Sequence, residues 1–328
     1  MNKLNQSIIK RTEATLQPVI SLSPIVLPVS GRRHDLELRI SAPLTGVDLP
    51  IILFAHGFGS SMDGYAPLVN FWAARGFVVI QPTFLDSRTL ADHHEADHSE
   101  AVKKFLSDPR TALIWRQRVD DMKHILDQLE YIEDLVPGLK GRLDRGRIAA
   151  AGHSFGAHTV GLLSGARVIK PNGSLDDVML DKRIKAAVLL SAGGRGGDAL
   201  SAFAKEHFPY LEQSYAELRV PTLVVAGDQD YSPLTVLGPE WFTDVFTLSP
   251  GAEWLLTLFG AEHMLGGISG YLVRETTDEN PAVVAAVQKM TYAYLRSALF
   301  PEEGDWEQAI RELEEDTDAV GRIDGKHT

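Results

Sequence analysis

Ser154 stands at the centre of a Gly-His-Ser-Phe-Gly pentapeptide, residues 152–156. The pentapeptide follows a short apolar run, RIAAA (147–151), and precedes a stretch of helical character, AHTVGLLSGA. Between a strand and a helix, G-x-S-x-G predicts a sharp turn that exposes the serine hydroxyl, and its glycines avoid clashes with neighbouring backbone. The pattern therefore indicates a nucleophilic serine; the alternative is a glycine-rich turn that carries an ordinary serine.

A serine hydroxyl is a weak nucleophile unless a base accepts its proton. His263 follows the apolar run EWLLTLF (253–259). A loop at that end of a parallel strand faces the same sheet edge as Ser154. The histidine also comes last in the chain order Ser, Asp or Glu, His. We therefore expect His263 to be the base.

Such a histidine needs a carboxylate that orients its ring and stabilises its protonated form. Asp230 follows the apolar run PTLVVA (221–226) and is the favoured acid. Asp228, two residues before it, and Asp198, which follows a glycine-rich loop, remain the alternatives.

Attack on a carbonyl group also requires hydrogen-bond donors for the charge that develops on oxygen. The backbone N–H of Phe155, directly after Ser154, is one expected donor. The second is expected from Phe58, in the His-Gly-Phe-Gly turn after the apolar run 50–55. The alternative for that turn is a tight strand-to-helix connection with no role in binding.

Two segments are expected to form cap or lid material around this site, residues 86–110 and 231–250. The expected pocket walls are Phe58, Phe155, Tyr231, Trp241 and Met264, and the last three are expected to contact the substrate; plain core packing is the alternative. No metal is expected at the site.

The elements that must position these residues are visible as apolar runs alternating with amphipathic stretches. Continuous apolar runs bounded by Gly or Pro predict strands buried on both faces; they are 50–55, 77–81, 147–151, 184–190, 221–226 and 253–259. Residues 36–41 alternate in polarity and predict an antiparallel edge strand. Residues 112–130 and 281–299 carry apolar side chains at helical spacing, and Pro281 suits a first helical turn. The order predicts an α/β fold with a mostly parallel sheet of about eight strands and helices on both faces.

The composition further limits which kinds of protein, partner and site the chain can represent. The 328 residues are 44% hydrophobic and 23% charged, with a net charge of −12 that argues against nucleic acid as a partner. The chain has no cysteine, which excludes disulfides, cysteine-bound zinc and a thiol nucleophile. No run reaches the ~20 apolar residues of a membrane helix. The first residues lack the apolar core of a signal peptide, so we expect a cytoplasmic protein, or a secreted one if the chain is a trimmed mature form.

Residues 1–300 are expected to form a single domain. The acidic segment 301–328 is expected to be a solvated tail, with a short helix around 305–315 and a frayed end.

A competing motif lies at His94-Glu95-Ala96-Asp97-His98, which matches H-E-x-x-H of zinc proteases. Its surroundings are polar, and no third ligand is evident downstream. An acidic surface loop is the favoured interpretation.

These motifs together make the chain resemble members of the α/β-hydrolase superfamily. GHSFGAHTV resembles the serine turn of the platelet-activating-factor acetylhydrolases, and residues 54–84 resemble the oxyanion segment of those enzymes, of chlorophyllases and of cutinase-like polyester hydrolases. PTLVVAGDQDYSP with GAEH resembles the acid and base segments of the polyester hydrolases and of dienelactone-hydrolase-like esterases. Ala157 departs from the glycine usual in the acetylhydrolases, which take their acid from the loop that here holds Asp198.

The resemblance covers roughly residues 35–300. It implies the α/β-hydrolase fold and a serine carboxylic-ester hydrolase that forms an acyl-enzyme, needs no cofactor and acts on a small-molecule or lipid-like ester without integral membrane association. The alternatives are an amidase or acyltransferase with the same residues, a zinc hydrolase centred on His94 and His98, and a non-catalytic binding protein. Oligomeric state stays open.

Overall fold

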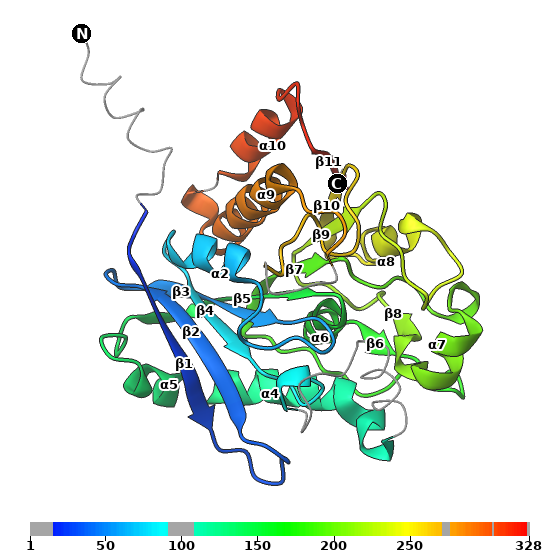
Figure 1. Cartoon of the computed structure of the whole chain (residues 1–328), viewed down its shortest axis with the longest axis horizontal. Helices are drawn as coiled ribbons and strands as arrows, with labels where there is room; N and C mark the ends of the chain where they lie inside the picture. Colours follow the sequence, from blue (N-terminus) through cyan, green and yellow to red (C-terminus); the bar gives the residue numbers. More distant parts are fainter. Residues whose placement is uncertain (1–15, 91–107, 271–275, 304, 327–328) are drawn as a thin grey trace.

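The computed structural model describes residues 16–90, 108–270, 276–303 and 305–326. Its main sheet contains these strands: β1 (Val19–Leu27), β2 (Leu36–Pro43), β3 (Leu49–Ala55), β4 (Val78–Pro82), β5 (Leu143–His153), β7 (Ile184–Leu190), β9 (Thr222–Gly227), β10 (Ala252–Leu258) and β11 (Gly321–Gly325). These nine lie in the order β1-β2-β4-β3-β5-β7-β9-β10-β11 (Figure 1). The strands from β4 to β10 are parallel, and β1, β2 and β11 are antiparallel to their neighbours. The short strands β6 (Arg167–Val168) and β8 (Gln213–Ser214) pair separately.

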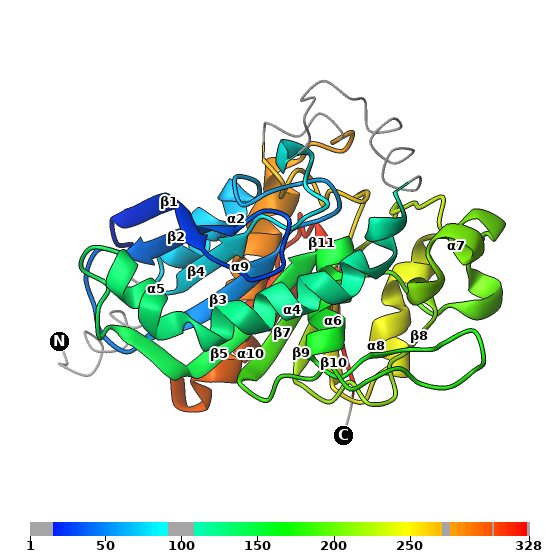
Figure 2. The same cartoon turned by 90° about the horizontal axis from the view of Figure 1, so that it is seen from below.

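Helices cover both faces of the sheet, as predicted (Figures 1 and 2). One face carries α2 (Ala66–Ala73), α9 (Pro281–Leu299) and α10 (Trp306–Glu314); the other carries α4 (Ile114–Asp127), α5 (Leu129–Leu135) and α6 (Phe155–Leu163). Shorter elements are α7 (Ala202–His207), α8 (Asp244–Leu248) and the 3₁₀ turns Arg88–Leu90, Pro109–Leu113, Gly197–Ala199, Pro209–Leu211, Pro239–Thr243 and Pro301–Glu303.

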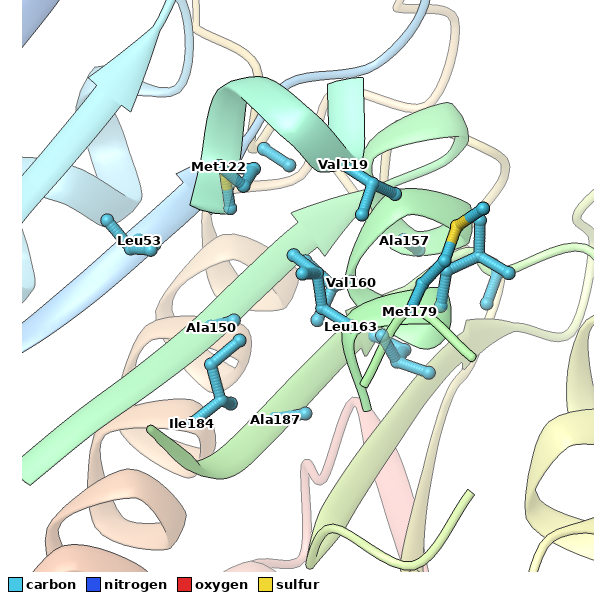
Figure 3. Packing of buried hydrophobic residues seen from close by; sticks show 14 of the residues in the cluster. Leu53, Val119, Met122, Ala150, Ala157, Val160, Leu163, Met179, Ile184 and Ala187 are labelled. Atoms are coloured by element: carbon cyan, nitrogen blue, oxygen red, sulfur yellow. The ribbon is translucent and has the colours of Figure 1, made fainter. Parts of the chain in front are cut away.

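Strand β3 shows why the parallel strands appear in the amino-acid sequence as continuous apolar runs. Successive side chains of a strand point to opposite faces. Ile51 and Leu53 belong to the core under α4 and α6, whereas Ile52 and Phe54 belong to the core under α2 and α9. Both faces are buried, so every position must be apolar. Figure 3 shows side chains of α4 and α6 packed together over the first of these cores.

Helix α9 confirms the predicted helix 281–299. The Asn280 side chain accepts hydrogen bonds from two N–H groups of the first turn, and Pro281 occupies that turn. Its buried side chains include the predicted apolar stripe Val283, Val287, Met290 and Tyr294. The other predicted helix, 112–130, is interrupted at Gln128, which separates α4 from α5.

The prediction of an edge strand at 36–41 is wrong. Strand β2 is antiparallel to β4, but β1 pairs with its other side, so β2 lies inside the sheet. Strand β1 escaped prediction because Pro24 interrupts its apolar run, and proline is found mainly in edge strands. The ladder between β1 and β2 shifts register between Leu22 and Ile25.

Where the structure describes it, the acidic segment does not fray as expected. Its helix is confirmed as α10, and beyond it β11 pairs antiparallel with β10. Trp306 anchors the helix, because its ring is buried against Trp254 and Tyr294 at centroid distances of 5.5 and 5.4 Å. Burial of these aromatic rings holds the segment on the sheet despite its charge.

Within the described ranges, the longest and most apolar helices still fall short of what a bilayer crossing requires.

Candidate active site

Ser154 sits at the turn between β5 and α6 in a conformation that few residues adopt. Its φ is 55° and its ψ is −118°, a strained combination for a residue with a side chain. The turn fits only because glycines flank it: a Cβ on Gly156 would lie 1.9 Å from the Ala55 carbonyl oxygen, and one on Gly152 would lie 2.4 Å from the Gly156 backbone. The strain holds the hydroxyl above the carboxyl end of the sheet.

The structure brings Ser154, His263 and Asp230 into one hydrogen-bonded line. His263 Nδ1 lies 2.9 and 3.2 Å from the two oxygens of Asp230, and His263 Nε2 lies 2.9 Å from Ser154 Oγ. Because a carboxylate only accepts, Nδ1 carries the proton in the neutral ring. Nε2 is then the acceptor and Ser154 Oγ the donor. Asp230 is fully buried, while 30% of the His263 side chain is exposed.

The other two candidate acids lie elsewhere. Asp228 accepts a hydrogen bond from the Gly260 N–H at 2.7 Å. Asp198 is fully exposed, 3.6 Å from Lys205. Of the three aspartates, Asp230 is the one in hydrogen-bond contact with His263.

A cavity of about 510 Å³ opens beside Ser154 and His263. The five expected wall residues all line it: Phe58, Phe155, Tyr231, Trp241 and Met264. Trp241 is buried and donates its indole N–H to the Arg195 carbonyl oxygen at 2.9 Å, whereas Tyr231 is 74% exposed. The expected cap segment 231–250 thus contributes to the wall. Of the segment 86–110, Arg88 lines the cavity, and residues 91–107 lie outside the described residues.

An aromatic wall was missed by sequence reasoning. The Tyr210 ring stacks on Phe155 at 5.8 Å and on Trp115 at 6.0 Å, and Phe208 packs edge-on against it. Tyr210 lies in a 3₁₀ turn without periodicity. No local pattern marks such a residue as part of a site.

A buried ion pair beneath the turn His56–Gly59 was also missed. Arg118 of α4 and Asp86 are fully buried and share two hydrogen bonds of 2.7 and 2.8 Å. Arg118 also donates to the His56 carbonyl oxygen at 2.7 Å, and Gly59 N–H donates to Asp86 at 3.2 Å. The pair therefore fixes the turn that carries Phe58. Burial raises the pKa of Asp86, but the charge and hydrogen bonds of Arg118 outweigh it and hold that pKa below its ordinary value.

Three buried histidines surround the site. Burial lowers the pKa of His56 to about 3, assisted by the positive charge of Arg118. Burial likewise lowers the pKa of His153 to about 3, assisted by His263, and that of His158 to about 4. All three are neutral in the folded protein near neutral pH, and each is in hydrogen-bond contact with a backbone carbonyl oxygen.

Acid is expected to destabilise the fold through these histidines. Below the ordinary histidine pKa of 6.5, the unfolded chain binds three protons on these side chains. The folded chain binds them only at lower pH, near pH 4 for His158 and near pH 3 for His56 and His153. Burial raises the pKa of Asp121 to about 6, which offsets one of them. With two net protons, the free energy of unfolding should fall by about 2.7 kcal/mol per pH unit between pH 6 and 4. Urea unfolding at several pH values measures this slope.

One variant distinguishes the effect of histidine protonation from other effects of acid on stability. His158→Gln removes one titrating group and should halve the slope in that window. An unfolding free energy that is equal at pH 6 and pH 4.5 in the wild type would contradict the prediction.

The H-E-x-x-H motif at 94–98 falls outside the described residues. Among those that are described, no three His, Asp or Glu side chains gather as a metal would require.

Comparison with known proteins adds two findings. A sequence model described as "Alpha/beta hydrolase family" matches residues 52–315, most of the chain. Two curated relatives, each named platelet-activating factor acetylhydrolase, are similar to this chain over a shorter stretch. The protein of Cavia porcellus is 28% identical over 144 residues and that of Canis lupus familiaris 29% over 147. Each match covers 37% of this chain and 33% of the relative, so the chain spans about a third of the length of these relatives.

Proposed function

Since the chain belongs to the alpha/beta hydrolase family, we propose that it is a serine hydrolase that cleaves carboxylic esters through an acyl-enzyme intermediate. The observation that carries the proposal is the hydrogen-bonded line from Ser154 through His263 to Asp230. A hydroxyl, an imidazole and a buried carboxylate in this order form the arrangement that activates a serine for acyl transfer.

In the first half of the reaction, Ser154 Oγ attacks the ester carbonyl carbon while its proton moves to His263 Nε2. Asp230 stabilises the imidazolium through the Nδ1–H bond. The oxyanion lies against the N–H groups of Phe155 and Phe58; the first belongs to the opening turn of α6, whose N–H groups have no partner within the helix. The C–O bond to the alcohol then breaks, and the alcohol leaves with the proton of His263.

In the second half, water replaces the alcohol. His263 accepts a proton from that water as its oxygen attacks the acyl carbon. Collapse of the second oxyanion breaks the bond to Ser154, which recovers its proton from His263 and releases the acid. The cycle needs no cofactor.

The cavity favours a small-molecule or lipid-like ester. Aromatic side chains such as Phe155, Phe208 and Tyr210 form part of its wall, which suits an apolar acyl or alcohol group. The relatives' name, acetylhydrolase, designates hydrolysis that releases an acetyl group, which is compatible with an ester as the substrate proposed here. Amides, and acceptors other than water, would use the same three residues, so turnover of matched ester, anilide and alcohol-acceptor substrates decides between these reactions.

Labelling with a fluorophosphonate tests the proposal directly. The wild-type protein is expected to gain one adduct, read by intact mass, because an activated serine attacks phosphorus as it attacks a carbonyl. Ser154→Ala should gain none, and Ser191→Ala, which alters another serine lining the cavity, should still react.

The outcomes separate the alternatives. A folded wild type that binds ester analogues without forming an adduct would identify a binding protein. Hydrolysis that survives Ser154→Ala but stops with a chelator would point to a metal-dependent reaction.

A further inference from the structure

Tyr65 and His153 form a buried hydrogen-bonded link beneath the candidate site. Tyr65 is the residue before α2, and His153 is the last residue of β5, directly before Ser154. Tyr65 Oη lies 2.8 Å from His153 Nδ1, and both side chains are almost completely buried. Each of the two side chains also contacts a loop. The Gly57 N–H donates to Tyr65 Oη at 3.0 Å, and His153 Nε2 lies 2.7 Å from the His263 carbonyl oxygen.

The direction of every hydrogen bond in this link is fixed by chemistry. A carbonyl oxygen only accepts, so His153 Nε2 carries a proton and donates to His263. In the neutral ring Nδ1 is then an acceptor, and Tyr65 must donate its single hydroxyl proton to it. The Tyr65 oxygen is left to accept from the Gly57 N–H. All four groups are satisfied in one arrangement, and each alternative orientation would leave a buried group without its partner.

The link joins the parts of the site that must keep their relative positions. Gly57 immediately precedes Phe58, the proposed oxyanion donor. His263 is the proposed base, and its carbonyl oxygen also accepts from Ser191 Oγ at 3.2 Å. Tyr65 N–H in turn donates to the Ser269 carbonyl oxygen at 3.0 Å, farther along the loop that carries His263.

We propose that Tyr65 and His153 are positioning residues, which hold the turn carrying Phe58 and the loop carrying His263 at a fixed separation across Ser154. The inference rests on the proposed function. Neither residue exchanges a proton with the substrate. Burial keeps His153 neutral while the neighbouring His263 gains and loses its proton, since the pKa of His153 is lowered to about 3. A ring centroid distance of 5.0 Å brings the two imidazoles close without a hydrogen bond between their rings.

Tyr65→Phe tests the inference by removing only the central hydroxyl. We expect kcat for an ester to fall about ten- to a hundred-fold, since small displacements of catalytic groups carry costs of this size, while KM stays within about threefold. The rate of fluorophosphonate labelling should fall with kcat. Tyr294→Phe is the matched control, because Tyr294 Oη is buried and, in the described part of the chain, has no hydrogen-bond partner. It should leave kcat unchanged.

Coupling between the two residues gives a second readout. In a His153→Leu background, Tyr65→Phe should change kcat less than twofold, because the link is already broken. His153→Gln, which keeps an N–H donor in reach of the His263 carbonyl oxygen, should recover part of the loss caused by leucine. Melting temperatures of the variants confirm that each is folded at the assay temperature.

¹⁵N NMR of histidine-labelled protein tests the link without any substrate. His153 should remain the neutral Nε2–H tautomer down to about pH 4, and its Nδ1 resonance should shift in Tyr65→Phe. Wild type that shows these signals but forms no fluorophosphonate adduct would refute the proposed function and leave the link intact. Equal kcat in Tyr65→Phe and Tyr294→Phe, in an enzyme that does label, would overturn the positioning role.

Discussion

Asp230→Asn is expected to lower kcat/KM for ester hydrolysis about 10,000-fold. An asparagine amide in place of the carboxylate can offer an N–H to His263 Nδ1 and so favour the ring tautomer with its proton on Nε2. That nitrogen then faces Ser154 Oγ, 2.9 Å away, as a donor and cannot accept its proton. The amide also leaves the imidazolium of the reaction without a counter-charge. Steady-state kinetics on a chromogenic ester measures the loss.

Asp228→Asn is the matched control, two residues away on the same loop. Its side chain accepts from Gly260 rather than from His263, so we expect a change in kcat/KM of less than about fivefold. A large loss in Asp228→Asn or in Asp198→Asn, together with a small one in Asp230→Asn, would assign the acid to another residue. Because Asn is nearly the size of Asp, all three variants should fold, and circular dichroism checks this.

Arg118→Met is expected to destabilise the protein by about 3–5 kcal/mol. The substitution leaves the fully buried Asp86 carboxylate without its counter-charge, and the His56 carbonyl oxygen loses a donor as well. The free energy of unfolding from guanidinium titration measures the effect. Fluorophosphonate labelling should also slow, because the released turn carries Phe58.

Two further variants show whether burial is the cause. Arg116→Met alters an arginine of the same helix whose ion pairs with Asp176 and Asp177 are partly exposed, so its cost should stay below about 1 kcal/mol. Combining Arg118→Met with Asp86→Leu removes both buried charges and should recover much of the stability. A double variant as unstable as Arg118→Met alone would contradict this explanation.

The fold was largely predictable because its central strands are buried on both faces. Such strands must be apolar at every position, so β3, β5 and β9 stand out from the surrounding sequence. The outermost strands, β1 and β11, need not be apolar at every position. β1 contains a proline, and β11 is the polar segment GRIDG, whose pairing with β10 depends on where α10 delivers it.

The same distinction applies to the candidate site, where residues that follow an apolar strand were easier to predict than residues placed by tertiary packing. Ser154 and His263 could be located because each follows a recognisable strand at the same edge of the sheet. The choice of Asp230 over Asp228 depended on backbone geometry that alternation in sequence does not specify. Arg118 escaped notice because a charged residue in an amphipathic helix is normally exposed, and its burial depends on Asp86, 32 residues away. Contacts of that kind are set by tertiary packing.

The two edge strands, β1 and β11, also affect whether molecules of this protein can associate through their sheets. An unprotected sheet edge offers unpaired N–H and C=O groups to a strand of a neighbouring molecule. In β1, Pro24 has no N–H to offer and lies where the ladder shifts register. β11 is only five residues long and carries the ion-paired Arg322 and Asp324. Both edges therefore disfavour strand addition, which protects the nine-stranded sheet from growing into an intermolecular aggregate.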